Sequence, residues 1–347
     1  MTSKTVTRAI LMVCATTTLF FGQAYSQESE LTEYLQSATT PAGKTDSNKL
    51  IGAYVSPLVE GLSYGLNGGW YHTAKAHKTL GIDLGVSVNA VFVPNNKLTF
   101  DPTALKLETI HTVQPGARAS TFIGPSGKTA YAFNSNPSAT FNGPEGIDLK
   151  GNIGMNVVPA PTAQLGIGIW KNTDIKFRYM PEIEVSETKI KMIGFGVLHD
   201  IKQHIRSIKL LPFDLSVVAA FTRFNGVTGL EGTFAKPAND QRRQEMTYQM
   251  NAWLFQALIS KKLSVITFYG GLGYNTIKTN VDLLGSYVIV DGDPSSAIKD
   301  PFFVKYKNSS FRATAGFRLK LGPIYLNTDY SLQEYSTLSV GLGLTVR

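Results

Sequence analysis

Residues 80–92, LGIDLGVSVNAVF, alternate between apolar and small or polar side chains over thirteen positions. The apolar face consists of Leu80, Ile82, Leu84, Val86, Val88, Ala90 and Phe92. A period of two residues indicates a β-strand with one apolar face, and soluble strands usually have about five or six residues. A tilted strand that crosses a bilayer needs about 9–11 residues, so this segment has the length of a membrane-crossing strand.

The same alternation recurs along the chain, most clearly in residues 311–321 and 338–346. Weaker versions occur at 62–72, 163–169, 173–179, 214–222, 246–255 and 264–274. The polar faces are rich in Gly, Ser, Asn and Gln, which suits a crowded or water-filled lumen better than the solvent face of a β-sandwich. A closed barrel satisfies every backbone group in lipid. The sequence therefore predicts an all-β chain that forms a transmembrane antiparallel β-barrel, with a secreted soluble β-protein as the alternative.

The number of strands follows from counting these segments back from the C-terminus. Eleven segments qualify: 61–72, 79–92, 161–169, 172–181, 187–198, 212–225, 245–258, 263–283, 305–320, 323–332 and 336–346. Bacterial single-chain barrels have even strand numbers, so we expect a further strand within 93–160, with 104–113 as the best candidate. The prediction is twelve strands, with fourteen as the alternative. The rest of the 93–160 region, rich in Gly, Pro, Asn and Ser, should form surface loop or an infolded plug.

Residues 1–26 have the features of a secretory signal peptide. Lys4 and Arg8 precede an uncharged apolar run, and Ala24 and Ser26 supply small residues at a cleavage site. The only cysteine, Cys14, lies in this segment, and the net charge of +8 falls to +6 without it. No later segment has 18 consecutive apolar residues. With 43% hydrophobic and 17% charged residues the chain is not disordered. We expect it to be exported to the outer membrane of a Gram-negative bacterium.

Residues 27–60 precede the predicted barrel, which would occupy residues 61–347. Leu50, Tyr54 and Leu58 follow helical spacing, and Pro57 should kink the helix. A short plug inside the barrel and a periplasmic lead-in both fit this pattern.

Residues 200–211 predict a second helix. Ile201, Ile205, Ile208 and Leu211 form one apolar stripe, with basic side chains on the other faces. Such a helix is typical of a membrane interface; packing against the rim of the barrel is the alternative.

Five basic residues fall on the polar faces of predicted strands: Lys176, Arg178, Arg312, Arg318 and Lys320. If these faces line the lumen, the pore wall is basic and favours anions or carboxylate head groups. Alternatively, these side chains neutralise luminal acids such as Asp83, Asp214 and Asp329, or contact lipid phosphates at the rim.

Three stretches carry a resemblance: LNGGWYHTAK at 66–75, GFGVLHDIK at 194–202 and LPFDLS at 211–216. They resemble an uncharacterised family of outer-membrane β-barrel proteins of Bacteroidota, over most of the mature chain. More distantly, the layout is similar to that of the long-chain fatty-acid transporter barrels. This second resemblance implies passage of hydrophobic molecules, although no substrate-binding motif carries over residue by residue.

The expected function is a passive channel or transporter for small hydrophobic or amphipathic molecules. The alternative is a non-transporting barrel that serves as a surface-binding or structural module. We expect no enzymatic activity, cofactor or metal, because the five histidines show no metal-binding spacing and residues 124–129, GPSGKT, lack the first glycine of a phosphate loop. Expected partners are outer-membrane lipid and lipopolysaccharide, the barrel-assembly machinery and a small solute of unknown identity. Nucleic acid is excluded because the basic residues are dispersed.

Overall fold

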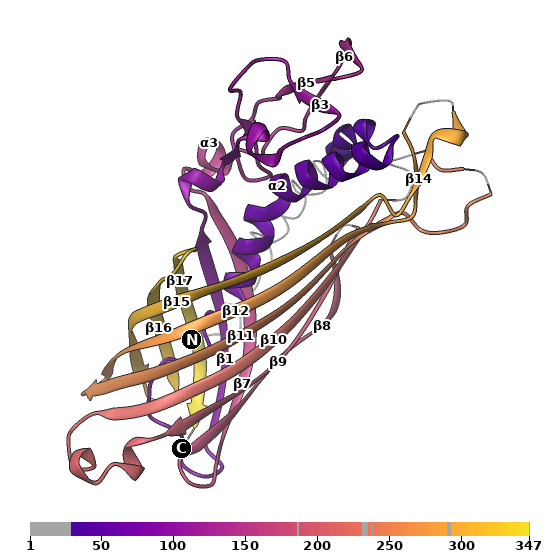
Figure 1. Cartoon of the computed structure of the whole chain (residues 1–347). Coiled ribbons are helices and arrows are strands. Elements are labelled where there is room, and N and C mark those ends of the chain that lie inside the picture. The colour runs from indigo at the N-terminus through magenta and orange to yellow at the C-terminus, as the bar shows by residue number, and fades with distance from the viewer. Residues whose placement is uncertain (1–28, 186, 231–234, 238, 290–292, 347) are drawn as a thin grey trace.

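Ten antiparallel strands close into a barrel in the computed structural model, which describes residues 29–185, 187–230, 235–237, 239–289 and 293–346 (Figure 1). The strands are β1 (Ile82–Phe92), β7 (Val157–Ile169), β8 (Thr173–Val185), β9 (Thr188–Asp200), β10 (Asp214–Gly229), β11 (Glu245–Leu263), β12 (Ile266–Leu284), β15 (Phe302–Leu321), β16 (Ile324–Leu332) and β17 (Thr337–Val346). Strand β1 closes the ring because Ile82 lies opposite both Val346 of β17 and Ile167 of β7.

The barrel has two different ends. At the C-terminal end, where β17 finishes, the turns at 170–172, 264–265 and 322–323 are tight, and the longest connection is 201–213. At the opposite end, which we call the loop end, lie residues 93–156, 230–244 and 285–301. Two short strands, β13 (Ser286–Val288) and β14 (Ala297–Lys299), form a hairpin in the last of these connections.

The predicted strands are confirmed except at two places, and the barrel has ten strands rather than twelve or fourteen. Residues 61–72 form the end of a helix and a coil inside the barrel, because their apolar side chains pack in the lumen instead of facing lipid. Residues 104–113 contain part of a 3-10 turn, η3 (Pro102–Leu105), and strand β3 (Ile110–Thr112). Strand β3 pairs with β5 (Ala130–Phe133), outside the barrel sheet.

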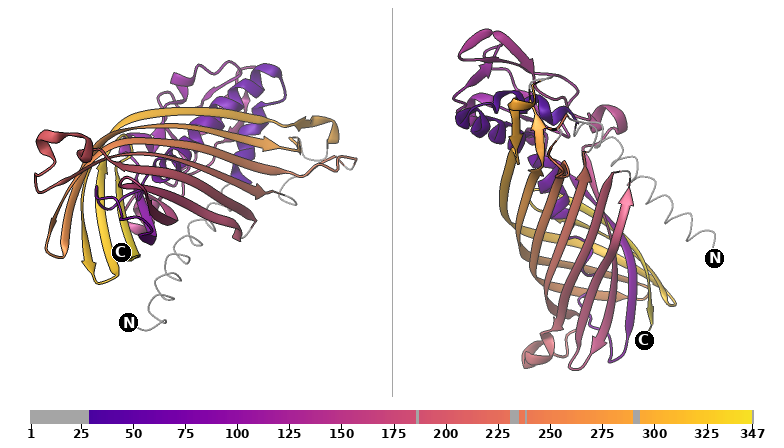
Figure 2. Two further views of the ribbon diagram at one scale, coloured as in Figure 1. Left: turned by 90° about the horizontal axis from the view of Figure 1, so that it is seen from below. Right: turned by 90° about the vertical axis from the view of Figure 1, so that its right-hand side faces the viewer.

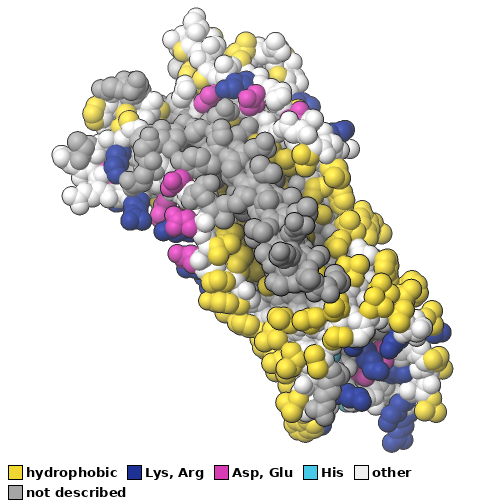
Figure 3. Space-filling model, turned by 180° about the vertical axis from the view of Figure 1, so that it is seen from behind, with side chains coloured by type: hydrophobic (Ala, Val, Ile, Leu, Met, Phe, Trp, Pro, Cys, Tyr) yellow, Lys and Arg dark blue, Asp and Glu magenta, His cyan; other side chains and the backbone are white. Residues whose placement is uncertain are grey.

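The outer wall of the barrel carries a band of exposed apolar side chains, part of which is visible on the face shown in Figure 3. Strand register aligns aromatic side chains across neighbouring strands in two rows: Phe177, Phe195, Phe221 and Trp253 across β8 to β11, and Phe255, Tyr274 and Phe311 across β11, β12 and β15. Two residues further toward the loop end, the aligned positions on β10, β11 and β12 are polar, namely Arg223, Asn251 and Lys278, whereas those on β8 and β9 are Tyr179 and Ile193. An exposed apolar band bordered by aromatic residues is typical of a barrel wall that faces lipid. Within the described ranges, no helix is both long and apolar enough to span a membrane.

The N-terminal helix α2 (Pro41–Gly65) descends from the loop end into the barrel (Figures 1 and 2). Thr40 caps its first turn by accepting a hydrogen bond from the backbone N–H of Gly43 at 3.0 Å, and Pro41 suits the first helical position. The helix packs against β15, β7, β1, β12 and β11, and it continues through Pro57. A 3-10 helix, η1 (Ser29–Ser37), precedes it and packs against it.

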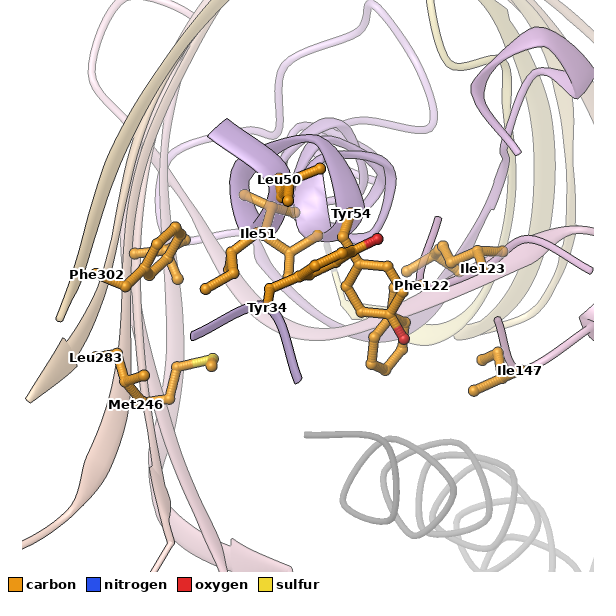
Figure 4. Close-up of a cluster of buried hydrophobic side chains, with 14 of the residues drawn as sticks. Tyr34, Leu50, Ile51, Tyr54, Phe122, Ile123, Ile147, Met246, Leu283 and Phe302 are labelled. Carbon is orange, nitrogen blue, oxygen red and sulfur yellow. The ribbon is translucent and has the colours of Figure 1, made fainter. Parts of the chain in front are cut away.

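A folded cap covers the loop end. Most of residues 93–156 belong to it, with small sheets from β2 (Thr99–Phe100) and β4 (Ala119–Ser120), and from β3, β5 and β6 (Asn136–Asn142), together with helix α3 (Leu149–Ile153). Its core is shared with the outer half of α2: the ring of Tyr54 lies 6.2 Å from that of Tyr34 and 5.9 Å from that of Phe122 (Figure 4). Leu50 and Tyr54 are fully buried, and the partly buried Leu58 packs against the same cluster.

The prediction of a helix at 200–211 is wrong. The segment has two separate 3-10 turns, η4 (Lys202–His204) and η5 (Arg206–Ile208), with extended backbone at Ile205 between them. The Nζ of Lys202 donates to the backbone carbonyls of Leu211 and Phe213, so the chain folds back on itself instead of extending as a helix. Of the four residues predicted to share one stripe, Ile205 and Leu211 are exposed, whereas Ile201 and Ile208 are partly buried.

Candidate functional site: the lumen and its plug

Residues 66–78 connect α2 to β1 through the inside of the barrel, and we call them the luminal plug. Two glycines allow this path close to the wall. A Cβ atom at Gly68 would lie 2.4 Å from Oδ1 of Asn89. Gly69 has a φ of +68°, a backbone conformation that residues other than glycine rarely adopt. The plug therefore depends on the sequence Gly68-Gly69 at its start.

Two buried arginines hold the junction between α2 and the plug. The guanidinium of Arg178 on β8 donates to the carbonyls of Leu66 at 2.9 Å and Gly68 at 2.7 Å. Arg312, on β15, donates to the carbonyl of Asn67 at 2.7 Å. Carbonyls at a helix C-terminus have no partner within the helix and carry partial negative charge. The two guanidinium groups thus satisfy this end of α2 both by hydrogen bonding and electrostatically.

Trp70 packs against the wall beside this junction. Its side chain is completely buried, and the guanidinium carbon of Arg178 lies 3.8 Å from the ring centroid, a cation–π geometry. On the other side the wall is hollowed by two inward-facing glycines of β9. A Cβ atom at Gly194 or Gly196 would lie 3.2 or 2.8 Å from the indole ring. The absence of side chains at these two positions makes the room for Trp70.

The middle of the plug is bonded to β10 and β11. The hydroxyl of Tyr71 donates to Oε1 of Gln256 at 2.7 Å. The backbone N–H of Ala74 donates to Oγ of Ser260 at 3.0 Å, and Ser216 donates to the carbonyl of Ala74. These bonds fix the plug to the wall below Trp70.

Histidines and aspartates hold the last part of the plug. His72 lies 3.1–3.2 Å from the Asp83 carboxylate, which also accepts a hydrogen bond from Tyr325 at 3.0 Å. Nδ1 of His77 lies 2.8 Å from Oδ2 of Asp174. The plug is therefore held by polar contacts along its whole length.

The basic residues predicted to line the pore do lie on inward faces of the barrel. Lys176, Arg178, Arg312 and Arg318 are buried, and Lys320 is partly buried. The guanidinium of Arg318 lies 4.4 Å from the ring centroid of Tyr325. Two of these five, Arg178 and Arg312, hold the plug through the carbonyls described above. Of the predicted acidic partners, Asp83 and Asp329 are buried within the lumen, and Asp214 is partly buried at the C-terminal end.

Sequence reasoning missed the plug because residues 61–72 were assigned to the wall. The three stretches that carry the family resemblance nevertheless pointed to the plug, because residues from all three meet there in the structure. The first, at 66–75, is most of the plug. The second contributes Gly194 and Gly196, which accommodate Trp70, and the third contributes Ser216, which binds Ala74.

The chain matches the model of a family of unknown function, DUF6588, over residues 3–346. It belongs to this family. The origin in Bacteroidota stays a prediction. No curated protein matches the chain.

Several solved structures are similar to this DUF6588 chain. The attachment invasion locus protein Ail of Yersinia pestis is 6% identical, covers 77% of this chain and 99% of its own, and has a TM-score of 0.27. The translocator domain of the autotransporter NalP from Neisseria meningitidis is 10% identical, with coverages of 83% and 93% and a TM-score of 0.28. A FadL homologue of Pseudomonas aeruginosa is 10% identical, with coverages of 77% and 88% and a TM-score of 0.20.

Proposed function

We propose that this DUF6588 protein is an outer-membrane barrel that is sealed by its own plug and displays the cap at the cell surface. The observation that carries this proposal is the packing of Trp70 between Arg178 and the two wall glycines. It places a fully buried aromatic side chain in the lumen, where an open channel would have water. The proposal corresponds to the non-transporting alternative rather than to a passive channel.

The apolar outer band and the predicted signal peptide support a location in the outer membrane. Barrels of this class have short periplasmic turns and longer extracellular loops. The tight turns at the C-terminal end therefore favour a periplasmic position for that end, and the cap then faces outward. In this orientation residues 29–60 lie at the cell-surface end, which argues against the periplasmic lead-in.

Two measurements test the proposal. Purified protein in liposomes should pass neither ions nor small sugars. In addition, an epitope inserted between Ser126 and Gly127, in an exposed part of the cap, should bind antibody on intact cells, whereas one inserted between Ser207 and Ile208 should not. Solute flux through the intact protein, or a cap epitope that is reached only after the outer membrane is permeabilised, would contradict the proposal.

Gated transport of small hydrophobic or amphipathic molecules is a second candidate, and one observation favours it. Several buried polar atoms in the lumen have no hydrogen-bond partner in the described part of the chain, among them Nε1 of Trp70, Nδ1 of His72 and Nη2 of Arg318. Because unsatisfied buried polar groups are costly, the entry of water would offset part of the cost of releasing the plug.

A disulfide separates the two candidates. The hydroxyl oxygens of Ser63 on α2 and Thr279 on β12 lie 3.0 Å apart, so cysteines at both positions can lock the helix to the wall. Flux that is present in the reduced double variant and absent in the oxidised one would favour gated transport. The absence of flux in both states is the result expected for a sealed barrel.

A further inference from the structure

A pocket of about 530 Å³ opens at the loop end between α2 and β15. Its volume is in the range of small-molecule sites, about 300–1,000 Å³. Gly52 and Ala53 of α2, Leu105 of the cap and Val304 of β15 give it apolar walls. The polar part of its lining consists of Thr45, Asn48, Lys49, Ser56 and Glu60 of α2 and Tyr306 of β15. Among the described lining residues Glu60 is the only carboxylate, and a ligand with an apolar body and a cationic group can place that group there.

The rigidity of the pocket comes from a close approach of helix and wall. The hydroxyl of Tyr306 on β15 donates to the carbonyl of Gly52 at 2.6 Å. A Cβ atom at Gly52 would lie 3.4 Å from the side chain of Val304. The pocket is therefore bounded by two elements that are bonded to each other.

The Glu60 carboxylate belongs to a cluster that already holds an ammonium group. Its Oε2 accepts a hydrogen bond from the hydroxyl of Tyr335 at 2.5 Å and lies 3.4 Å from Nζ of Lys97. The same Nζ lies 3.4 Å from Oε1 of Glu334 and 6.0 Å from the ring centroid of Tyr335. Burial and the nearby Glu60 carboxylate raise the pKa of Tyr335 well above its usual value, so its hydroxyl stays protonated and donates.

The charges of this cluster are unbalanced. Two carboxylates, Glu60 and Glu334, share the single lysine Lys97, whose side chain is about one-third exposed at 36%. Among the described residues, both contacts of the Glu60 carboxylate fall on Oε2. Because Glu60 also lines the pocket, a second cation that enters the pocket would meet this carboxylate.

We propose that this pocket binds a small primary amine that carries an apolar chain, with its ammonium group at Glu60. The ammonium of Lys97, set between carboxylates and an aromatic ring, shows the chemistry that the cluster accepts. The apolar walls formed by Ala53, Leu105 and Val304 then hold the chain of the ligand. A carboxylate in the same position would be repelled by Glu60 and Glu334, and a neutral alcohol would lack the charge-assisted hydrogen bond.

This inference adds a ligand to the proposed display of the cap at the cell surface. It rests on that proposal in one respect only, namely that the ligand would reach the pocket from outside the cell. Binding is measured on the full-length protein in neutral detergent and flux is measured in liposomes, so either result can fail without the other. The probes are hexylamine, hexanol and hexanoate, which share one chain and differ in the head group. Calorimetry should detect saturable binding of hexylamine alone.

Variants locate the site. Glu60→Gln should weaken hexylamine binding at least about tenfold, because it removes a hydrogen bond to a charged group. Lys97→Met removes the competing ammonium and should tighten binding several-fold. Ala53→Phe fills the pocket while the cluster stays intact, and should abolish binding even if Glu60→Gln fails to fold. Glu182→Gln, which changes a carboxylate paired with Lys191 on the exposed surface, is the control and should bind as the parent does.

Hexylamine that binds no more tightly than hexanol would overturn the inference. Unchanged affinity in Ala53→Phe would also overturn it, because the amine would then bind elsewhere.

Discussion

Replacement of Arg178 by methionine should release the plug from the wall. Methionine fills a similar volume but leaves the carbonyls of Leu66 and Gly68 without their donor. Each unsatisfied buried acceptor costs about 1–3 kcal/mol, and the lost cation–π contact with Trp70 adds about 1–2 kcal/mol. Among the described residues, the Arg178 guanidinium has no carboxylate contact, so removing it also removes the cost of burying an unpaired charge and offsets part of this loss. The net loss is about 2–4 kcal/mol, which corresponds to roughly a 30- to 1,000-fold larger population of the released plug.

The assay is maleimide labelling of a cysteine that is reachable only when the plug and the end of α2 leave the wall. Ser63→Cys supplies it in a background without Cys14, because Ser63 is buried at 1% exposure against Thr279. Arg178→Met should raise the labelling rate by the same factor of about 30 or more. Lys191→Met, an exposed basic residue on β9, is the matched control and should leave the rate unchanged. A rate in Arg178→Met within about threefold of the parent would refute the role assigned to this arginine.

Three further predictions follow from the lumen and the outer wall. Gly196→Val should lower the free energy of unfolding by about 1–3 kcal/mol, because the new side chain would overpack against Trp70. The measurement is the temperature at which heat-modifiable migration changes. A transition temperature equal to that of the parent would contradict the packing of the indole. Brominated phospholipids should quench Trp170 and Trp253, which are exposed on the outside, but not Trp70, so a variant with Phe at both exposed positions should lose most of the quenching. Asp83→Asn should destabilise the barrel by about 1–3 kcal/mol, because the carboxylate binds a histidine and a tyrosine of the lumen; a variant as heat-resistant as the parent would show that the plug does not depend on this contact.

The wall of the barrel was predictable because membrane strands repeat one rule along their whole length. Lipid outside and a polar lumen inside impose alternation on each strand, as in residues 80–92, and ten of the predicted segments are strands. The rule fails for residues 61–72, where Leu62, Tyr64 and Leu66 also alternate. Their apolar side chains meet the barrel interior and the cap rather than lipid, and local periodicity does not distinguish these environments.

The candidate site was less predictable because its contacts join distant parts of the chain. Arg178 was correctly placed on an inward face, but its acceptors at Leu66 and Gly68 lie more than a hundred positions away. The predicted helix at 200–211 fails for a related reason. Its spacing is helical, but Lys202 bonds to carbonyls at the end of the segment and closes it into a loop.

The path of the chain through the barrel also fixes an order of events during biogenesis. The strand that follows the plug, β1, forms the seam of the barrel with β17, the barrel strand furthest from it along the described chain. Once this seam is hydrogen-bonded, the lumen is a closed ring with α2 threaded through its loop end and the cap folded around the outer half of that helix. The plug joins β1 at the C-terminal end, so residues 29–65 would have to thread through a finished ring from that end to reach the cap. We therefore expect the seam to close around a helix that is already in the lumen, so that the pore is sealed and the wall is completed in a single step.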